Sequence, residues 1–533
     1  MNRTEQCAES VFDYVIVGGG SAGCAIAARL SEDPDCRVCL LEAGPDDSNP
    51  LFSVPMALSL TVPSRLGNWA FETVPQAGLN GRRGYQPRGK VLGGSSSINA
   101  MIAIRGHRQD YDRWISEGAE GWGYSDVLPH FRKLETFEGA PSALHGIDGP
   151  VAVSAPRTTH GLNEKFIQAG IDLNIPENND FNGERQEGIG LFHLCQRNGR
   201  RASASKAYLS EAKSRPNLSV STKTHVETLL FQERRAIGVS TNRGRYNARR
   251  EVILCAGAIQ TPQILMCSGI GPQEELKKND ISVLVDSPNV GRNLQDHLDV
   301  ALLYRSRSPR TSGYHFASLV RTALGWLPYL RHGRGAWTTN FNESGAFLRT
   351  SPTLNQPDVQ LHFATALIED HGRKLQWGRG VSCHVCGLRP KSRGSVRLNS
   401  PSTHDAPLID PNYLSHPEDI HTLKNGLRIA NRVMTAPAMS DVVQSPTDPI
   451  VFESDEALCE TIRERADTIY HPVGTCRMGK DTASVVDPFL NVRGVTGLRV
   501  ADASVMPSIV SGNTNLPTIM IGERAADFIR REQ

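Results

Sequence analysis

The order of hydrophobic and polar positions predicts strands that alternate with helices from the N-terminal end of the chain onward. Residues 12–17 are a run of β-branched and aromatic side chains, typical of a buried strand. The alanine-rich helical pattern CAIAARLSE follows, and a second apolar run lies at 37–41. A later strand, EVILCAG, precedes the helical pattern TPQILMCSG, which ends at glycine and proline. This alternation predicts a parallel sheet with crossover helices, an α/β fold.

The pattern changes in the second half of the chain. Residues 358–363 and 394–398 read as strands, and we expect them in an antiparallel sheet. Residues 316–334 contain an amphipathic stretch in which Arg321, Arg331 and Arg334 edge a face of leucine and tryptophan. Two interpretations of this stretch stay open: it lies on a membrane surface, or it is a helix that packs over the entrance to the ligand site.

Length and charge narrow the class of protein. At 533 residues the chain is long enough for two or three domains with a large buried core. Its 58 basic and 56 acidic side chains nearly balance, which argues against a dedicated nucleic-acid binder. A hydrophobic content of 39% is too high for a disordered chain. The 48 glycines follow no collagen-like period, so we expect them at particular backbone positions.

The cysteines indicate a reducing compartment. Eleven are scattered along the chain, an odd number that does not suit a disulfide framework. Cys36/Cys39 and Cys383/Cys386 are C-x-x-C pairs, but a zinc site needs four converging ligands, so we predict buried thiols and no metal. The sequence shows neither a secretory signal pattern nor a run of about 18 apolar residues. We expect a cytoplasmic protein, soluble or peripheral at the inner face of the membrane.

The first glycine cluster predicts a dinucleotide site. Gly18, Gly20 and Gly23 form G-x-G-x-x-G between the first predicted strand and helix. Glycines here permit a tight turn, close approach of the backbone to a pyrophosphate, and close packing of helix on strand. Glu42 ends the second strand about 20 residues later, where a carboxylate holds ribose hydroxyls. An acid at that position favours NAD or FAD over NADP.

Three further segments carry candidate chemistry. GKVLGGSSSINAMIAIRGH, from Gly89, offers amides and hydroxyls to a pyrophosphate or a planar ring, and its apolar second half is compatible with a helix. A flexible turn is the alternative. GAIQTPQILMCSGIGP places small residues at a strand end, where a ligand passes close by. HPVGTCRMG, from His471, and the later GNTNLPTIMIGE bring a histidine and asparagines into loops before an amphipathic C-terminal helix.

Together with NVGRNLQDH, these segments resemble the glucose–methanol–choline (GMC) oxidoreductase family, in particular its choline dehydrogenase-like and L-sorbose dehydrogenase-like members. The resemblance runs from about residue 12 to the C-terminus. It implies an α/β fold (α+β overall) in which a Rossmann-like FAD-binding domain is assembled from residues 1–155, 195–300 and 456–533. The inserted substrate-binding domain, on an antiparallel sheet, would comprise residues 156–194 and 301–455.

The resemblance also implies a set of FAD contacts, with Trp69 and Val226 near the adenine. Ile98 stands where some choline-oxidising members carry a histidine that attaches FAD covalently, so we predict non-covalent FAD. The full set of expected contacts is Gly18, Gly20, Ser21, Ala22, Gly23, Glu42, Ala43, Trp69, Val91, Gly93, Ser97, Asn99, Ala100, Met101, Ile102, Val226, Ala256, Gly257, Asp502, Ala503, Asn515, Pro517 and Thr518.

For catalysis the resemblance implies a His–Asn pair. His471 matches the base that takes the hydroxyl proton of an alcohol, and Asn513 matches a position that holds histidine or asparagine. Asparagine is no base near neutral pH, but it can hydrogen-bond the substrate oxygen. A hydride would then pass from the carbinol carbon to flavin N5, giving an aldehyde or ketone.

Several points stay open. The alcohol is a primary alcohol, a polyol or a choline-like compound, and the electron acceptor is a quinone, another carrier or oxygen. Glu343 either binds a cationic head group or a substrate hydroxyl, or is satisfied by local backbone groups, and Tyr470 is a second candidate substrate contact. A non-redox member of lyase or photodecarboxylase type and a catalytically silent flavin-binding scaffold are the competing functions. The sequence leaves the oligomeric state undefined.

Overall fold

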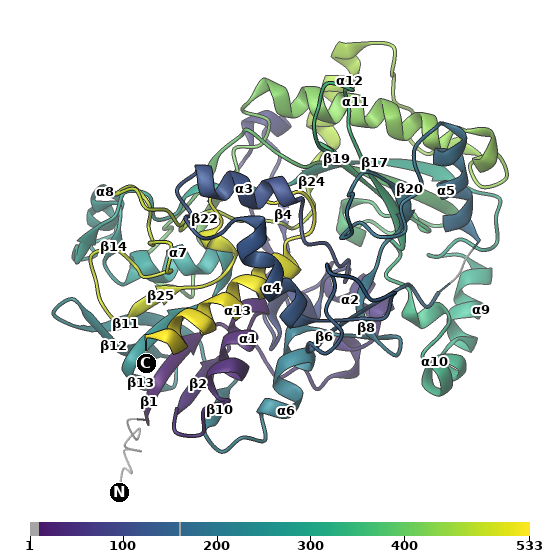
Figure 1. Ribbon diagram of the computed structural model, residues 1–533. Coiled ribbons are helices and arrows are strands. Elements are labelled where there is room, and N and C mark those ends of the chain that lie inside the picture. Colours follow the sequence, from purple (N-terminus) through teal and green to yellow (C-terminus); the bar gives the residue numbers. More distant parts are fainter. Residues whose placement is uncertain (1–9, 159–160, 533) are drawn as a thin grey trace, which may run out of the picture.

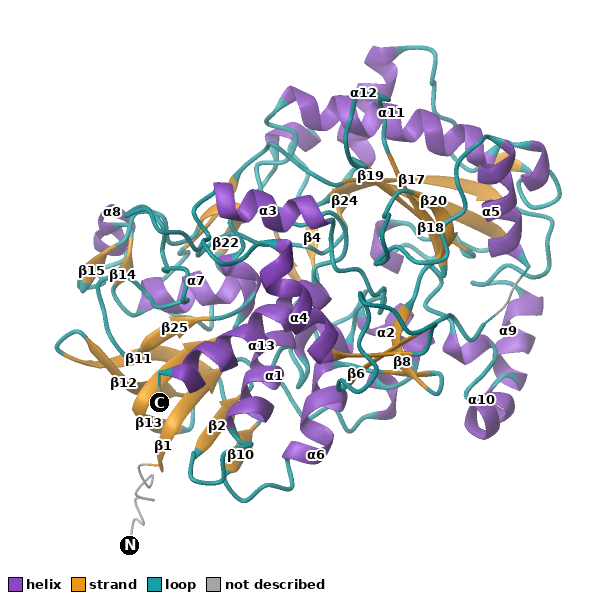
Figure 2. Cartoon of the chain, viewed as in Figure 1, coloured by secondary structure: helices purple, strands orange, loops and turns teal. Residues whose placement is uncertain are grey.

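Two seven-stranded sheets organise the fold of the computed structural model, which describes residues 10–158 and 161–532 (Figure 1). The first sheet lies near the N- and C-terminal ends of the described chain, and the second lies on the opposite side of the molecule (Figure 2). Each sheet is completed by strands from distant parts of the sequence. The prediction of a mixed α/β fold is confirmed.

The first sheet has a parallel centre and an antiparallel edge. Its order is β10-β2-β1-β13-β12-β11, and β25 also pairs with β13. The parallel strands are β1 (Ser10–Val17), β2 (Val38–Leu41), β10 (Leu218–Ser221), β13 (Gly244–Leu254) and β25 (Leu498–Val500). The strands β11 (Val226–Gln232) and β12 (Arg235–Thr241) form the antiparallel edge.

Two helices stack on the first sheet because small residues let them approach closely. The helix α1 (Ser21–Leu30) is rich in alanine and almost wholly buried. The C-terminal helix α13 (Asn515–Arg531) packs against it, and a side chain at Gly522 would come within 2.8 Å of the Ala22 backbone. The crossover helix α7 (Gly257–Cys267) follows β13 directly. These elements match the strand–helix pattern that the sequence predicts.

The second sheet is antiparallel. Its strands are β7 (Gly188–Leu191), β18 (Ser344–Leu348), β19 (Val359–Ala364), β20 (Gly380–Gly387), β17 (Leu298–Arg305), β23 (Ser445–Pro446) and β24 (Asp467–Thr468). The helices α5 (Leu162–Asp172), α11 (Pro417–Met434) and α12 (Asp455–Arg465) pack beside it (Figure 1). In this second core the rings of Phe166 and Phe363 stack with centroids 4.7 Å apart. The predicted strand at 358–363 belongs to this sheet.

Shorter elements complete the chain. The predicted strand at 394–398 is β21 (Gly394–Arg397), which lies in a small sheet with β16 (Arg292–Leu294) and β22 (Leu408–Asp410) rather than in the large antiparallel one. The remaining strands are β3 (Phe71–Glu72), β4 (Tyr85–Gln86), β5 (Glu135–Phe137), β6 (Val151–Ser154), β8 (Leu194–Arg197), β9 (Arg200–Arg201), β14 (Ile270–Gly271) and β15 (Val285–Asp286). The remaining helices are α2 (Leu58–Thr61), α3 (Arg108–Ser116), α4 (Tyr124–Leu134), α6 (Ser210–Ala212), α8 (Gln273–Lys278), α9 (Phe316–Leu324) and α10 (Trp326–His332).

Two segments whose patterns are compatible with a single helix differ from it in the structure. After a single 3₁₀ turn at Gly94–Ser97, residues 98–107 contain no helix, and Met101 and Gly106 have positive φ angles of 61° and 91°. The segment instead contacts β8 and the residue before it: Ala103 N donates to His193 O, and Cys195 N donates to Met101 O. The apolar pattern is compatible with a helix, but none forms there. The amphipathic stretch at 316–330 is two helices, α9 and α10, that meet at Gly325.

The cysteines in the described part of the chain behave as predicted. Their thiols are free, and all except the half-buried Cys459 are buried. Within that same part, no group of three or more histidine, cysteine or acidic residues is arranged to hold a metal ion. Among the described helices, none combines the length and the apolar character needed to cross a bilayer. The division into two domains stays a prediction.

Candidate active site

A cavity of about 1390 Å³ lies between the two large sheets. At one end its wall includes Val17 and Leu41, the last residues of β1 and β2. At the other end it includes Ala301 of β17 and His362 of β19. In open α/β sheets, ligands bind outside the carboxyl ends of the parallel strands, so the cavity lies where that rule places a ligand.

Most of the expected site residues line this one cavity. They come from nine separated segments of the chain. On the wall are Gly18, Gly20, Ser21, Ala22, Glu42, Ala43, Trp69, Asn99, Ala100, Met101, Ile102, Val226, Ala256, Gly257, Tyr470, His471, Asp502, Ala503, Asn513, Asn515 and Thr518.

Five expected cofactor contacts lie behind the wall: Gly23, Val91, Gly93, Ser97 and Pro517. A Cβ on Gly23 would lie 2.0 Å from the carbonyl oxygen of Gly18, so this glycine permits the close packing of α1 on β1. The Ser97 hydroxyl donates to Leu92 O at 2.8 Å and faces Gly93. These five residues therefore support the residues that line the cavity and do not line it themselves.

The dinucleotide turn presents a fixed carboxylate and a free helix end. The Glu42 carboxylate accepts hydrogen bonds from Gly19 N at 3.0 Å and from Gly44 N at 2.7 Å. Burial raises the pKa of Glu42 to about 7, against the lowering effect of these two amides. No side chain caps the N-terminus of α1 at Gly20, so its amides are available to a pyrophosphate.

The serine loop docks directly on this turn. Gly93 N donates to Gly19 O at 2.6 Å, and a Cβ on Gly94 would come within 2.8 Å of Gly20 Cα. Both Gly93 and Gly94 have positive φ angles, of 90° and 55°, which glycine adopts without strain. Two segments 70 residues apart therefore form one continuous backbone surface at the cavity.

Asp502 organises a third part of the wall. Its buried carboxylate accepts from Gly257 N at 2.8 Å, Thr261 Oγ1 at 2.6 Å and Ser504 N at 2.8 Å. Burial raises the pKa of Asp502 above its usual value. Because these bonds use the carboxylate, Asp502 fixes the N-terminus of α7 beside the cavity.

His471 and Asn513 lie in contact on the cavity wall. Asn513 Nδ2 lies 3.2 Å from His471 Nε2, although the two residues come from separate loops. Gln360 Nε2 on β19 donates to Asn513 Oδ1 at 3.3 Å, which sets the orientation of the asparagine amide. The amide NH₂ therefore faces the histidine.

A second histidine fixes the tautomer of His471. His297 Nε2 lies 2.9 Å from Leu388 O, and a carbonyl only accepts, so this nitrogen carries the proton. Burial lowers the pKa of His297 to about 4, so the ring is neutral and its Nδ1 is an acceptor. His471 Nδ1 lies 3.0 Å from that nitrogen and must donate to it. This leaves an unprotonated Nε2 on His471, facing Asn513 and the cavity.

Burial keeps His471 neutral as well. It holds the pKa of His471 well below its ordinary value, and the nearby His297 and His362 lower it further. Neither ring nitrogen of His362 has a hydrogen-bond partner, although the residue is buried and lines the cavity. Such a group is available to a bound hydroxyl or to water.

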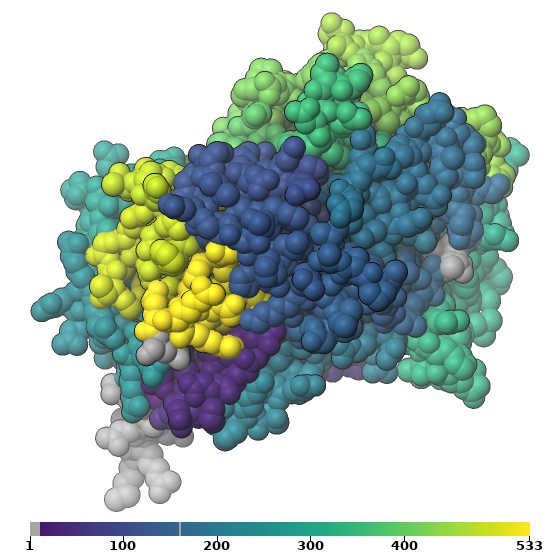
Figure 3. Space-filling view, in the orientation of Figure 1, coloured from purple at the N-terminus to yellow at the C-terminus, as the bar shows by residue number. Residues whose placement is uncertain are grey.

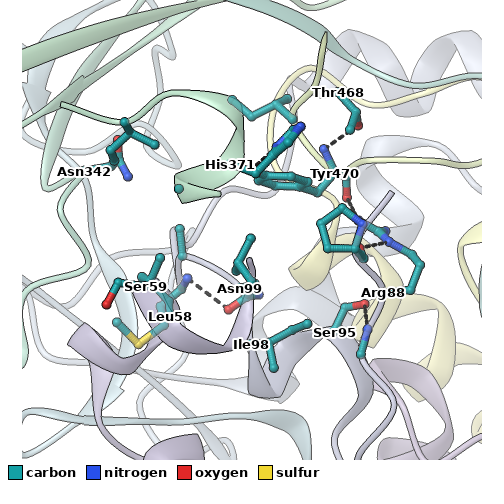
Figure 4. A pocket seen from close by; sticks show the side chains of 18 of the residues that line it. Leu58, Ser59, Arg88, Ser95, Ile98, Asn99, Asn342, His371, Thr468 and Tyr470 are labelled. Atoms are coloured by element: carbon teal, nitrogen blue, oxygen red, sulfur yellow. Dashed lines mark hydrogen bonds between the residues drawn. The ribbon is translucent and has the colours of Figure 1, made fainter. Parts of the chain in front are cut away.

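The backbone before His471 is strained and held from several sides (Figure 4). Tyr470 has a φ of 74°, which a non-glycine residue adopts only under constraint. Its amide donates to Thr468 Oγ1, its carbonyl accepts from Arg88, and its hydroxyl lies 2.7 Å from His371 Nδ1. The next amide, of His471, donates to Asp296 Oδ1 at 2.8 Å.

Glu343 does not reach the cavity. Its side chain is fully buried, it is absent from the wall, and Thr339 donates a hydrogen bond to Oε1. Burial raises the pKa of Glu343 to about 6. The structure therefore does not place Glu343 at the cavity as a substrate contact: the residue lies directly before β18, and its side chain is buried in the protein interior.

Sequence reasoning missed four residues that surround His471 and Asn513: Asp296, His297, Gln360 and His362. Two of them lie in NVGRNLQDH, and two lie in the alternating strand at 359–364. Of these four, only His362 lines the cavity, and the others lie behind it in contact with His471 or Asn513. Their proximity depends on the pairing of β19 with β20 and of β20 with β17, which begins directly after His297.

The fold and the site define a dinucleotide-binding oxidoreductase. Residues 12–299 and 390–522 match the two domain models of the GMC oxidoreductase family. An alcohol dehydrogenase [acceptor] of Pseudomonas putida is 47% identical, covering 98% of this chain and 96% of the relative. An oxygen-dependent choline dehydrogenase of Klebsiella pneumoniae is 42% identical, with the same coverage. A formate oxidase variant of Aspergillus oryzae, studied for its FAD modification, superposes with a TM-score of 0.91 at 28% identity, covering 98% and 99% of the two chains. The chain belongs to the GMC oxidoreductase family, whose cofactor is FAD.

The residues present fit FAD. Glu42 offers its carboxylate to ribose hydroxyls, the open N-terminus of α1 suits a pyrophosphate, and Trp69 and Val226 line the wall together at one side of the cavity. Ile98 lines the wall within the serine loop, and its hydrocarbon side chain cannot form a covalent bond to the flavin.

Proposed function

We propose that this protein oxidises an alcohol to an aldehyde or ketone, with His471 as the base and Asn513 as the partner of the substrate oxygen. The tautomer chain from Leu388 O through His297 to His471 carries the proposal. It leaves a lone pair on His471 Nε2 at the cavity, which is what removal of a hydroxyl proton requires. The names of the two enzyme relatives support this choice of reaction.

Each of the three side chains has its own role in the proposed oxidation. His471 Nε2 takes the hydroxyl proton and holds it, while His297 Nδ1 accepts from the opposite edge of the ring and steadies the resulting cation. The Asn513 NH₂ donates to the alkoxide oxygen as its charge develops. FAD, held without a covalent link, supplies the hydride acceptor when it is bound.

For the substrate and the electron acceptor we propose a chemical class and no single compound. We favour a neutral alcohol, because the Asp299 carboxylate on the cavity wall is already paired with His384, at 2.6 Å, and is not free to bind a cationic substrate. A dye, a quinone or another carrier would reoxidise the cofactor in a dehydrogenase, and oxygen would do so in an oxidase. One relative is named as acceptor-dependent and another as oxygen-dependent, so the experiment below also tests which acceptor reoxidises the cofactor.

The test is anaerobic reduction of the bound flavin by a panel of alcohols, followed at its visible absorbance. We expect bleaching with at least one primary alcohol, and replacing His471 with Ala should slow it by about 10²–10⁴-fold while FAD stays bound. Admitting air then separates oxidase from dehydrogenase. A panel without any bleaching, or a His471→Ala variant with the normal rate, would refute the proposal.

A further inference from the structure

The helices α9 and α10 have their apolar and polar faces reversed. Surface helices normally bury their apolar side and expose their polar side. In α9 the buried residue is Ser318, and in α10 it is Tyr329, whereas the large apolar side chains point outward. Those exposed side chains are Phe316 (83%), Leu319 (49%), Val320 (39%), Leu324 (69%), Trp326 (48%), Leu327 (39%) and Leu330 (60%).

This reversal is held in place by polar contacts on the inner side. Arg321 donates to Pro309 O and Thr311 O, and the indole of Trp337 donates to Thr322 O at 2.8 Å. The His315 side chain caps the N-terminus of α9. The two helices are thus anchored with their apolar side facing out, and they project at the edge of the molecule (Figure 1; the same segment lies at the lower right in Figure 3).

The charge of the same segment has one sign. Residues 300–342 contain six arginines and neither aspartate nor glutamate, in a chain whose total charges nearly balance. Arg331 and Arg334 are exposed beside the apolar side chains. An apolar surface with leucine, phenylalanine and tryptophan, edged by arginine, suits an interface between hydrocarbon and anionic head groups.

The surface also borders the cavity. Ser318, Leu319, Arg321 and Thr322 of α9 belong to the cavity wall, together with Leu58 and Leu60 around α2. Leu60 and Leu319 are both about half exposed, at 52% and 49%, so the rim of the cavity lies here. Whatever covers α9 therefore lies at the entrance to the proposed active site.

We propose that α9 and α10 form a docking surface for the anionic face of a lipid bilayer. The apolar side chains enter the head-group region, and Arg331 and Arg334 contact lipid phosphates. The rim of the cavity then lies against the bilayer, so that an apolar alcohol dissolved in the membrane can enter. Docking itself stands apart from the proposed oxidation; only the entry of the alcohol rests on it.

The experiment is flotation of the FAD-loaded full chain with vesicles of phosphatidylcholine, with and without phosphatidylglycerol. We expect binding to the anionic vesicles that weakens as salt is added. Leu324→Glu or Trp326→Glu should lower the partition at least tenfold. Ile147→Glu is the matched control, because Ile147 is as exposed as Leu324, at 69%, and lies outside α9 and α10.

A charge pair gives a second readout. Arg331→Gln with Arg334→Gln should weaken anionic vesicle binding roughly 25-fold, about fivefold for each arginine. The control, Arg245→Gln with Arg249→Gln, removes two exposed arginines from the hairpin of the first sheet and should bind as the parent does.

Three results would overturn the docking surface: no binding to either vesicle, equal binding by all variants, or self-association that Leu324→Glu abolishes without any vesicle binding. The last result would identify a second copy of the chain as the occupant. Anaerobic bleaching by a water-soluble alcohol, without vesicles, should be the same in all these variants, so failure of docking is distinguishable from failure of the proposed oxidation.

Discussion

At the scale of single residues, His471 is controlled by groups that never face the substrate. Leu388 O sets the proton on His297, and His297 sets the proton on His471. Burial removes the alternative in which either ring is charged, because it lowers both pKa values. One backbone carbonyl thus determines which nitrogen is the base.

This arrangement predicts the pH dependence of flavin reduction. The reaction needs neutral His471, and protonation inactivates it. Because the folded pKa lies well below 6.5, the rate should stay level as pH falls from 8 to about 6 and decline only at lower pH. Stopped-flow reduction under anaerobic conditions measures this profile. A decline centred near 6.5 would show a histidine with an ordinary pKa and contradict the expectation.

Variants of His297 separate positioning from packing in the same assay. In His297→Phe, no acceptor remains for His471 Nδ1–H, so the plateau rate should drop at least about tenfold, part of what a positioned base contributes. His297→Asn places an amide oxygen near the former Nδ1 and should retain more of the rate. Equal loss in both variants, with unchanged melting temperature, would exclude the tautomer role.

The residues that the sequence could reveal are those in contiguous motifs. A dinucleotide site is predicted by spacing alone, from Gly18, Gly20, Gly23 and Glu42. The roles of His471 and Asn513 follow from the family resemblance. His297 and His362 could not be given roles, because their positions depend on strand register. His297 lies directly before β17 and His362 lies on β19, and both strands pair with β20, which brings the two residues close to His471.

At the scale of elements, local patterns predicted helices and strands where tertiary contacts agree with them. The strand–turn–helix of β1 and α1 and the crossover from β13 to α7 appear as expected. The segment 98–107 has an apolar pattern that suits a helix, but its backbone pairs with β8 instead. Distant pairing of this kind overrides local propensity.

Alanine substitutions at two glycines of the same turn should differ in their effect on the stability of the apoprotein. In Gly23→Ala the new Cβ would lie 2.0 Å from Gly18 O, so α1 must move away from β1 and the apoprotein should lose about 1–3 kcal/mol of stability. Gly20 has a φ of −86° and its nearest neighbour to a new Cβ is 3.9 Å away, so Gly20→Ala should leave the apoprotein stable.

The cofactor distinguishes them further. Gly20 lines the cavity, so its added methyl group stands where the pyrophosphate must approach, and FAD affinity should decline. Thermal unfolding of the apoproteins and titration with FAD measure both properties. Equal stability of the two apoproteins would show that α1 has more room than its packing against Gly18 indicates.

At the scale of the whole molecule, the chain passes back and forth between its two large sheets. It leaves the first sheet after β13, builds most of the second from β17 to β24, and returns to the first at β25. The sequence indicated both kinds of sheet, but it could not show that the small sheet with β21 is separate. The cavity wall draws on both large sheets, and hence neither core forms the site alone.

This interleaving predicts one unfolding transition. Because the wall joins both sheets, loss of either core should destroy the FAD site and release the chain segments that the other core needs. FAD at about 100 times its Kd should add about 2.7 kcal/mol and move the whole transition upward. Scanning calorimetry of apoprotein and holoprotein measures this, with Gly20→Ala as the variant whose shift should be smaller. Two transitions, of which FAD moves only one, would mean that the second sheet unfolds as an independent domain and that the shared cavity does not couple the two cores.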